Sequence, residues 1–512
     1  MSTRESAPND SAAEGRLEKL LGTINVERLE TPEALSALGA LIDLAGDLKR
    51  SDGLDLALDW AGSLATRQLA SSEGMTLQFF TGNAWLEKYA SALSKGARQS
   101  HDWSQPELKN AILALRSVVA NESFAGWPLV RRAQLYTNLG NALSTLGRSL
   151  EAIAYRDKAL SLIPTFGMAL GTRAESIDAF RGVLYRSEDI HAYLVAASEG
   201  FAAATARDAA YESTGYAPVI ERWSKRCTEL QSWLVERPGD APPDIEVDPA
   251  IPESVYRGWC WRQRLIVNPL NDLGRPTRQA MVDNLHLPPI APHDQTAELL
   301  FGYLDTLKQE FCSARWSLYE AITAREQHFS DRITHHDTGD KPLHGLWIER
   351  IKSAYRVAYS VFDKVALFLN VYFELEMPAG DVTFSKVWGK QPLEPRVIFT
   401  ASNNLPLRGL YWISRDLGER GFKDVTEPDA QGMAELRNYI EHRFVRVVAA
   451  YGLTGSGAQG LLYRVTLRDF QRRAITILRL AREALIMLVS AVYVEERRKG
   501  PNRGPWTALK KL

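Results

Sequence analysis

Three polar side chains interrupt an otherwise apolar, helix-like stretch near the end of the chain, ELRNYIEHRFVRVVAAYG at residues 435–452. They are Arg437, Asn438 and His442. An imidazole titrates near neutrality and can transfer protons, and a guanidinium binds phosphate oxygens through two parallel hydrogen bonds. An asparagine can orient the histidine or the substrate. Together they would suit cleavage of a phosphodiester by its own neighbouring 2′-hydroxyl, a reaction that needs no metal and that RNA, unlike DNA, permits.

A helix over residues 430–451 would have to position these groups. On a helical wheel Asn438 and His442 are i, i+4 neighbours on one side, and Arg437 lies at the edge of the opposite, apolar side. Val445 and Ala449 flank the polar pair, so we expect this second face to be covered by another segment or by a second subunit. The apolar stripe expected to face the core consists of Met433, Leu436, Ile440, Phe444, Val447 and Tyr451.

The spacing of Arg and His alone carries little weight, because Arg186 and His191 repeat it in RSEDIH. The alternative interpretation of the triplet is a surface or interface cluster, with His442 hydrogen-bonded and Arg437 paired with Glu441 or Glu435. Context favours the catalytic interpretation of Arg437 and His442, since Arg437 is followed by Asn438 whereas Arg186 is followed by Ser187.

Other candidate sites are weaker. GLTGSGAQG, residues 452–460, lacks the Lys-Ser/Thr and the preceding strand of a phosphate-binding loop, so we expect a flexible loop between helices. THHDTGD holds four potential metal ligands without helical i, i+4 spacing, and a solvated turn is favoured over a metal site. These ligands are His335, His336, Asp337 and Asp340. No nucleophile elbow or cysteine-nucleophile signature is present, and the sequence indicates no cofactor and no bound metal.

Composition limits the class of protein. At 512 residues and 45% hydrophobic residues, the chain can form two or three domains with substantial cores. A net charge of −1 implies that any contact with RNA is local. Cys227, Cys260 and Cys312 are far apart and fit reduced thiols in a cytoplasm. Residues 1–29 are expected to form a flexible lead-in without a signal peptide, and the apolar run 484–494 is too short to span a membrane.

The end of the chain, RRKGPNRGPWTALKKL at residues 497–512, is basic and carries Trp506. It would suit phosphate contacts and base stacking, and an ordinary soluble tail is an equally good interpretation. Its basic residues are Arg497, Arg498, Lys499, Arg503, Lys510 and Lys511.

Residues 30–235 predict a solenoid of about three or four helical hairpins. The segment 136–164 has the residue spacing of a tetratricopeptide (TPR) unit, in which small residues let two antiparallel helices approach closely. The concave face of such an array either binds a protein or peptide or serves only as a scaffold, and the sequence leaves both open. The matching positions are Leu139, Gly140, Ala152, Tyr155, Ala159 and Pro164.

Residues 236–256 are rich in proline and acids and predict a linker between domains. The following domain, 257–496, has five long helical patterns. Its segment 377–402 is broken by Gly and Pro and predicts a long connection with a short extended piece. The helical patterns cover residues 295–328, 344–376, 403–418, 430–451 and 467–498.

RNYIEH, placed in the third helix of a C-terminal four-helix arrangement, resembles the Arg-x4-6-His motif of the HEPN superfamily. The layout resembles the bacterial branch in which TPR-like helices precede a HEPN domain. The resemblance implies an all-α fold and metal-independent endoribonuclease activity in toxin, abortive-infection or antiphage systems. It also implies a composite site across a homodimer, with Arg437, Asn438 and His442 as catalytic residues.

The helix at 295–328 and the loop at 377–402 are elaborations that could occlude this site. The alternative function is a non-catalytic adaptor that binds protein or nucleic acid. A third interpretation makes the protein the target or antitoxin of a paired nucleotidyltransferase.

Overall fold

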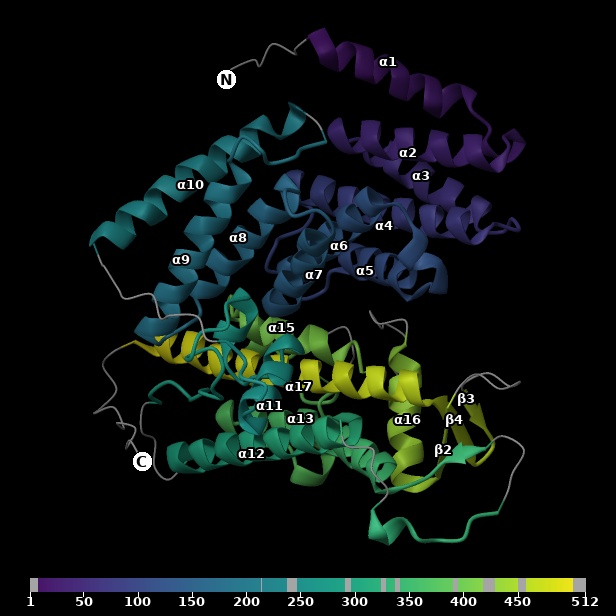
Figure 1. Ribbon diagram of the computed structural model, residues 1–512. Coiled ribbons are helices and arrows are strands. Elements are labelled where there is room, and N and C mark those ends of the chain that lie inside the picture. The colour runs from purple at the N-terminus through teal and green to yellow at the C-terminus, as the bar shows by residue number, and fades with distance from the viewer. Residues whose placement is uncertain are drawn as a thin grey trace.

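The structure is a computed structural model that describes residues 8–212, 214–236, 246–290, 296–323, 328–336, 341–389, 395–417, 429–449 and 457–500. The all-α prediction is confirmed, with one local exception, a four-stranded sheet. Helical hairpins form the N-terminal half and a helical bundle forms the C-terminal half, which lies beneath it in Figure 1.

The N-terminal half, called the array below, is a stack of antiparallel helix pairs. α2 packs on α3, α4 on α5, α6 on α7 and α8 on α9, and α10 covers α9. The array curves from α1 to α10 in Figure 1. Its elements are α1 (Pro8–Thr23), η1 (Val26–Arg28), α2 (Thr31–Asp47), α3 (Ser51–Leu64), α4 (Ser71–Ser94), α5 (Pro106–Ala120), η2 (Glu122–Gly126), α6 (Leu129–Thr145), α7 (Ser149–Leu162), α8 (Gly167–Arg181), α9 (Ser187–Ala204), η3 (Thr214–Tyr216) and α10 (Ala217–Glu236).

The pair α6 and α7 shows why the repeat pattern has small residues. A Cβ on Gly140 would lie 3.1 Å from the carbonyl oxygen of Ala152 and from the Arg156 side chain. Leu139 and Ala152 are fully buried between the helices. The predicted helical hairpin is therefore present, and its assignment to the TPR class stays a prediction.

The start of the chain differs from its prediction. Residues 8–23, expected to belong to a flexible lead-in, form α1, and Leu17 is fully buried against α2 and α3. A Cβ on Gly53 of α3 would lie 3.4 Å from the Leu17 side chain. Leu17, Leu20 and Leu21 supply an apolar face that the surrounding polar residues concealed in the sequence.

The C-terminal half is built on α12, α13 and α17, which pack on one another, with α15 and α16 against them. Four of the five predicted helices agree with the structure to within a few residues, α16 being the exception. The described part of 377–402 holds only a 3-10 turn and a one-turn helix. The helical elements are α11 (Pro252–Arg262), η4 (Pro269–Leu273), α12 (Thr296–Thr323), η5 (Phe329–Asp331), α13 (Leu346–Tyr372), η6 (Ala379–Asp381), α14 (Val397–Thr400), α15 (Leu405–Ser414), α16 (Ala430–His442) and α17 (Leu467–Lys499).

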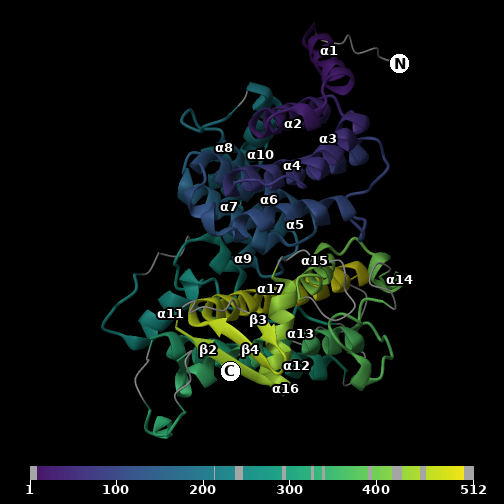
Figure 2. The ribbon, with the colours of Figure 1, turned by 90° about the vertical axis from the view of Figure 1, so that its right-hand side faces the viewer.

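The predicted helix over 430–451 is wrong beyond His442. Arg443 is extended, with φ −145° and ψ −160°, and the chain continues as a strand. Three valines in FVRVV favour this strand, because β-branched side chains lose rotamer freedom in a helix. The sheet has the order β1-β2-β4-β3, with β2 and β4 parallel and the outer pairs antiparallel. Its strands are β1 (Pro342–Leu343), β2 (Phe444–Val448), β3 (Gly457–Gln459) and β4 (Leu462–Thr466). Figure 2 shows β2, β3 and β4 beside α16.

One hydrophobic core runs from α4 of the array to α17 of the bundle. The loop of the α4/α5 pair places Trp103 against Tyr411, with ring centroids 5.2 Å apart. The Arg408 guanidinium donates to the carbonyl oxygens of Ser100 and Thr145, each at 2.5 Å. The two halves therefore meet through packed, hydrogen-bonded surfaces, to which the array contributes hairpin loops as well as helix residues.

Two glycines let the backbones touch at this junction. A Cβ on Gly409 of α15 would lie 2.6 Å from the carbonyl oxygen of Gly147, which has φ +87°. We predict that Gly409→Ala lowers the free energy of unfolding by about 1–3 kcal/mol, the usual cost of overpacking. Gly302→Ala in α12 is the matched control, because a Cβ there meets nothing within 4 Å and alanine favours a helix by about 1 kcal/mol. Urea unfolding of both variants measures the difference, and equal stability would contradict the close contact.

Buried charges also join the halves. The Asp416 carboxylate, after α15, accepts a hydrogen bond from Arg116 of α5 at 2.9 Å and pairs with Arg148, which precedes α7. Arg116 also pairs with Glu151 at 2.7 Å. Glu483 of α17 lies 3.9 Å from Arg148, and burial raises the pKa of its carboxyl to about 8.

Glu483 gives the fold a pH dependence. Its pKa is about 8 in the folded chain and near 4.5 when exposed, so the folded state binds more protons between these values. The stability contributed by protonated Glu483 is therefore complete below pH 4.5 and is lost as the pH rises toward 8. We predict that Glu483→Gln flattens the decline of unfolding free energy between pH 6 and 8.5 by up to about 1.4 kcal/mol per pH unit. Urea titrations across this range test it, and an unchanged slope would show that Glu483 is already ionised.

Candidate functional site

α16 is fixed against the bundle and the sheet, so its final turns have a defined position. The Tyr355 hydroxyl of α13 donates to the Met433 carbonyl oxygen at 2.9 Å. The Tyr439 hydroxyl donates to the Gly460 carbonyl oxygen, beside β4, at 2.7 Å. Of the predicted apolar stripe, Met433 and Leu436 are buried as expected, and Phe444 is 68% exposed because it begins β2. Tyr451 lies outside the described residues.

Arg437 lies against α13. Its guanidinium carbon is 5.5 Å from the centre of the Tyr359 ring, a cation–π contact, and its Nη1 donates to Asn438 Oδ1 at 3.3 Å. The neighbouring Asp363 carboxylate accepts from the Phe384 amide at 3.0 Å. Burial raises the pKa of Asp363, and the Phe384 amide and the Arg437 charge oppose that rise. Arg437 is thus half-buried and oriented by side chains of its own chain.

The predicted alternative partners of Arg437 are not its partners here. Glu435 accepts a hydrogen bond from Gln431 at 2.8 Å, and Glu441 is exposed. Among the described residues, no ion pair joins either glutamate to Arg437.

His442 is the last residue of α16 and is exposed. Its imidazole makes no hydrogen bond within the described ranges. Asn438 precedes it by four residues and therefore lies on the same helix face, one turn away. The structure joins Arg437 to Asn438 by a hydrogen bond and leaves His442 open to solvent beside them.

The sheet adds cations that the helical interpretation missed. Arg446 of β2 and Arg464 of β4 are directly paired in the parallel register and so project from the same face. Phe444 shares that face by strand alternation and is exposed. Arg443, between α16 and β2, lies over the Tyr439 ring at 5.0 Å. The alternation of arginine and valine in FVRVV could have indicated this face. It does so only if the segment is a strand, in which every second side chain points to the same side.

Arg186 and His191, the second pair with the same spacing, lie at the start of α9, where Arg186 holds the fold together. Arg186 precedes α9 and donates to the Asn284 carbonyl oxygen at 3.0 Å, which ties α9 to the segment before α12. Its Nε also lies 3.8 Å from the Asp189 carboxylate. His191, one turn into α9, is half-buried.

The other predicted candidates do not form a second site. His335 and His336 are exposed, and the His335 ring stacks on His344 with centroids 4.0 Å apart. Asp337 and Asp340 lie outside the described residues. In the described part of the chain no group of three or more His, Cys, Asp or Glu side chains could hold a metal ion. Gly457–Gln459 is β3, so the predicted flexible loop is wrong there, and the rest of GLTGSGAQG up to residue 456 is not described.

The cysteines and the described part of the C-terminal end take part in the packing and ion pairs of the fold. Burial raises the pKa of the Cys260 and Cys312 thiols to about 11. Arg498 and Lys499 pair with Glu495 and Glu496 in the last turn of α17. Residues 501–512, the rest of the predicted basic arm, are outside the description. None of the described helices has the length and hydrophobicity needed to cross a membrane.

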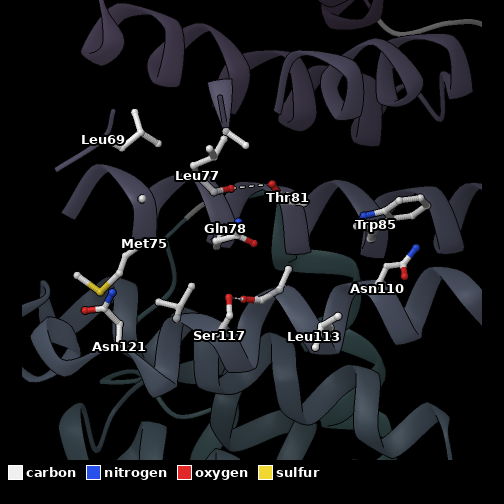
Figure 3. A pocket seen from close by; sticks show the side chains of 14 residues that line it. Leu69, Met75, Leu77, Gln78, Thr81, Trp85, Asn110, Leu113, Ser117 and Asn121 are labelled. Carbon is white, nitrogen blue, oxygen red and sulfur yellow. Dashed lines mark hydrogen bonds between the residues drawn. The ribbon is translucent and has the colours of Figure 1, made fainter. Parts of the chain in front are cut away.

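A pocket of about 610 Å³ lies in the array, between α4 and α5 (Figure 3). Trp85, Met75 and Leu77 line it together with the uncharged polar side chains Gln78 and Asn110. No charged residue is part of its lining, so it lacks the cations that phosphate chemistry needs. Its lining comes from the array alone and is separate from α16.

Comparison with known protein families gives a match for the C-terminal half. Residues 292–495 match the sequence model of the family described as LA2681-like HEPN, a range that begins just before α12 and ends within α17. It contains α16 and the whole sheet. No curated protein and no solved structure is similar to the chain at a significant level.

Proposed function

Because the domain at residues 292–495 is a HEPN domain, a domain type associated with RNA, we propose that the protein is an endoribonuclease that cuts RNA without a metal ion. The observation that carries the proposal is the end of α16. An exposed imidazole lies one turn from an asparagine that is hydrogen-bonded to an arginine.

The reaction assigns a role to each group. The RNA 2′-oxygen attacks the adjacent phosphorus, the bond to the 5′-oxygen breaks, and the products are a 2′,3′-cyclic phosphate and a 5′-hydroxyl. His442 moves a proton, either from the 2′-hydroxyl or to the departing 5′-oxygen. Arg437 neutralises charge on the phosphorane, and Asn438 orients the guanidinium or the substrate.

A complete cycle needs both a base and an acid, and α16 supplies one imidazole per chain. Two chains that bring their α16 ends together would supply two. We therefore propose a homodimeric site, in which the exposed His442 of each chain faces the other. The paired Arg446 and Arg464 would extend such a site with backbone contacts to RNA.

Incubation of the purified protein with end-labelled RNA in EDTA tests the activity. We expect fragments that end in a cyclic phosphate, and no cleavage where a 2′-deoxynucleotide replaces the nucleotide at the cut position. Intact RNA under all conditions, or fragments with 3′-hydroxyl ends, would refute this mechanism.

The biological role that we propose is a toxin, abortive-infection or antiphage nuclease, with the array sensing a signal or binding a protein that restrains cleavage. Expression of the wild-type chain should then arrest growth.

A non-catalytic adaptor is the second candidate, and the setting of Arg437 favours it. The guanidinium rests on Tyr359 beside Asp363, so in a single chain it serves packing. Tight RNA binding without cleavage in the same assay would support this function.

A further inference from the structure

A second group of cations lies at the junction of the two halves, away from α16. Lys158 is on α7 of the array, Arg479 is on α17 of the bundle, and Arg264 follows α11. In Figure 1, α7 lies above α17 with α11 in front of it. The side chains of Lys158 and Arg479 are each exposed to solvent on one side and surrounded by protein on the others. Three segments far apart in the sequence thus bring positive charge to one place.

The carboxylates near this group are already shared. Asp157 pairs with both Arg173, at 2.5 Å, and Arg264. Asp272 pairs with Arg264 at 3.2 Å and with Arg482 at 2.7 Å. Two acids therefore serve three arginines, and Arg264 depends on both.

Among the described residues, no carboxylate forms an ion pair with Lys158 or Arg479; the Glu151 carboxylate, which pairs with Arg116, acts on Lys158 only from a longer distance. Arg479 donates from Nε and Nη2 to the carbonyl and side-chain oxygens of Gln263, at 2.8 and 2.7 Å, which are neutral acceptors. The Lys158 ammonium lies 4.3 Å from the centre of the Tyr155 ring and 5.7 Å from that of Tyr136. Within the described ranges it makes no hydrogen bond.

The pKa values of Lys158 and Arg479 show that their surroundings disfavour the charged forms. Desolvation, and then the nearby Arg479, lower the pKa of Lys158 to about 8. Desolvation and the Arg264 charge lower the pKa of Arg479 to about 10. Burial first, and the neighbouring cations second, destabilise the charged forms of Lys158 and Arg479, and an anion bound between them would oppose the effect of the cations.

The two tyrosines add an aromatic surface. Tyr136 and Tyr155 lie with ring centroids 6.0 Å apart, on the paired helices α6 and α7. Aromatic side chains beside cations are the combination that binds nucleotides, since the base stacks and the phosphates pair with positive charge.

We propose that this junction cluster binds a nucleotide, with its phosphates between Lys158 and Arg479 and its base against Tyr155 or Tyr136. The ligand would contact the array through α7 and the bundle through α17, so it would stabilise the junction between them. This site is separate from α16, and its occupancy does not depend on RNA cleavage.

Calorimetric titration of the full chain with three probes tests the proposal. ADP carries base and phosphates, pyrophosphate carries only the charge, and adenosine carries only the base. We expect ADP to bind most tightly, pyrophosphate about tenfold more weakly, and adenosine not measurably, as expected when one stacked base adds to charge pairing. Equal binding of ADP and pyrophosphate would overturn the nucleotide assignment, and absence of ADP binding at millimolar concentration would overturn the site.

Substitutions in the junction cluster test where ADP binds. Lys158→Gln and Arg479→Gln should each weaken ADP binding by about tenfold, because each removes one charge-assisted contact. Lys88→Gln is the matched control, since Lys88 also lies over a ring, that of Trp85, elsewhere in the array. Thermal unfolding of each variant checks that the fold is intact. Unchanged ADP affinity in folded Lys158→Gln would refute the site.

Discussion

The His442→Ala variant should cut RNA about 10²–10⁴-fold more slowly than the wild-type chain, the range that general acid–base groups contribute. His442 is exposed at the end of α16 and makes no described hydrogen bond, so its removal should leave the free energy of unfolding nearly unchanged. Single-turnover cleavage of labelled RNA measures the rate, and growth arrest on expression should be relieved. His191→Ala, in the pair of Arg186 and His191 at the start of α9, is the control and should cleave at the wild-type rate.

Arg437→Ala should slow cleavage by about 10²–10³-fold if the guanidinium stabilises the phosphorane. This variant also removes the contact with Tyr359, so unfolding must be measured beside the rate. Mixing inactive Arg437→Ala and His442→Ala chains should restore part of the activity if each chain of a dimer contributes to the site. Full activity in both single variants would remove α16 from the mechanism.

Loss of the Asp416 carboxylate should produce the largest change in stability. Asp416 is 1% exposed and pairs with Arg116 and Arg148, themselves 3% and 1% exposed. Asp416→Ala leaves two buried guanidinium groups without this partner, and we expect a loss of about 3–5 kcal/mol in the free energy of unfolding. Urea unfolding followed by circular dichroism measures it.

An exposed pair provides the comparison. Asp55 pairs with Lys88 at 2.5 Å near the surface, and Asp55→Ala should cost less than about 1 kcal/mol. A similarly small loss for Asp416→Ala would mean that the buried pairs contribute no net stability.

The helices were predictable because the pattern that specifies each of them lies within a short segment of the sequence. Apolar residues recur at helical spacing through 295–328, 344–376, 403–418 and 467–498, and the structure has helices there. The interaction that fixes α16 and β2 is not local. β2 pairs with β4, whose residues lie 18 positions further along, so the strand at Phe444 depends on a partner that no short window contains. Val447 fits both a helical stripe and a strand, which made the error possible.

The candidate site was predicted in part. Asn438 and His442 fall on one helix face as expected, because both lie within α16, of which His442 is the last residue. The rest of the surroundings of Arg437 could not be predicted, since Tyr359 and Asp363 come from a helix more than 70 residues earlier. The junction was also hidden, because Asp416 and Arg148 are 268 residues apart and neither shows a motif.

The core that the two halves share has a consequence for how their sequences evolve. The array and the bundle touch backbone to backbone at Gly147 and Gly409, and they bury common charges. A substitution on the array side of this junction must be matched by a substitution on the bundle side. The two halves should therefore change in step during evolution, and a bundle joined to a foreign array would lack the surface against which it folds.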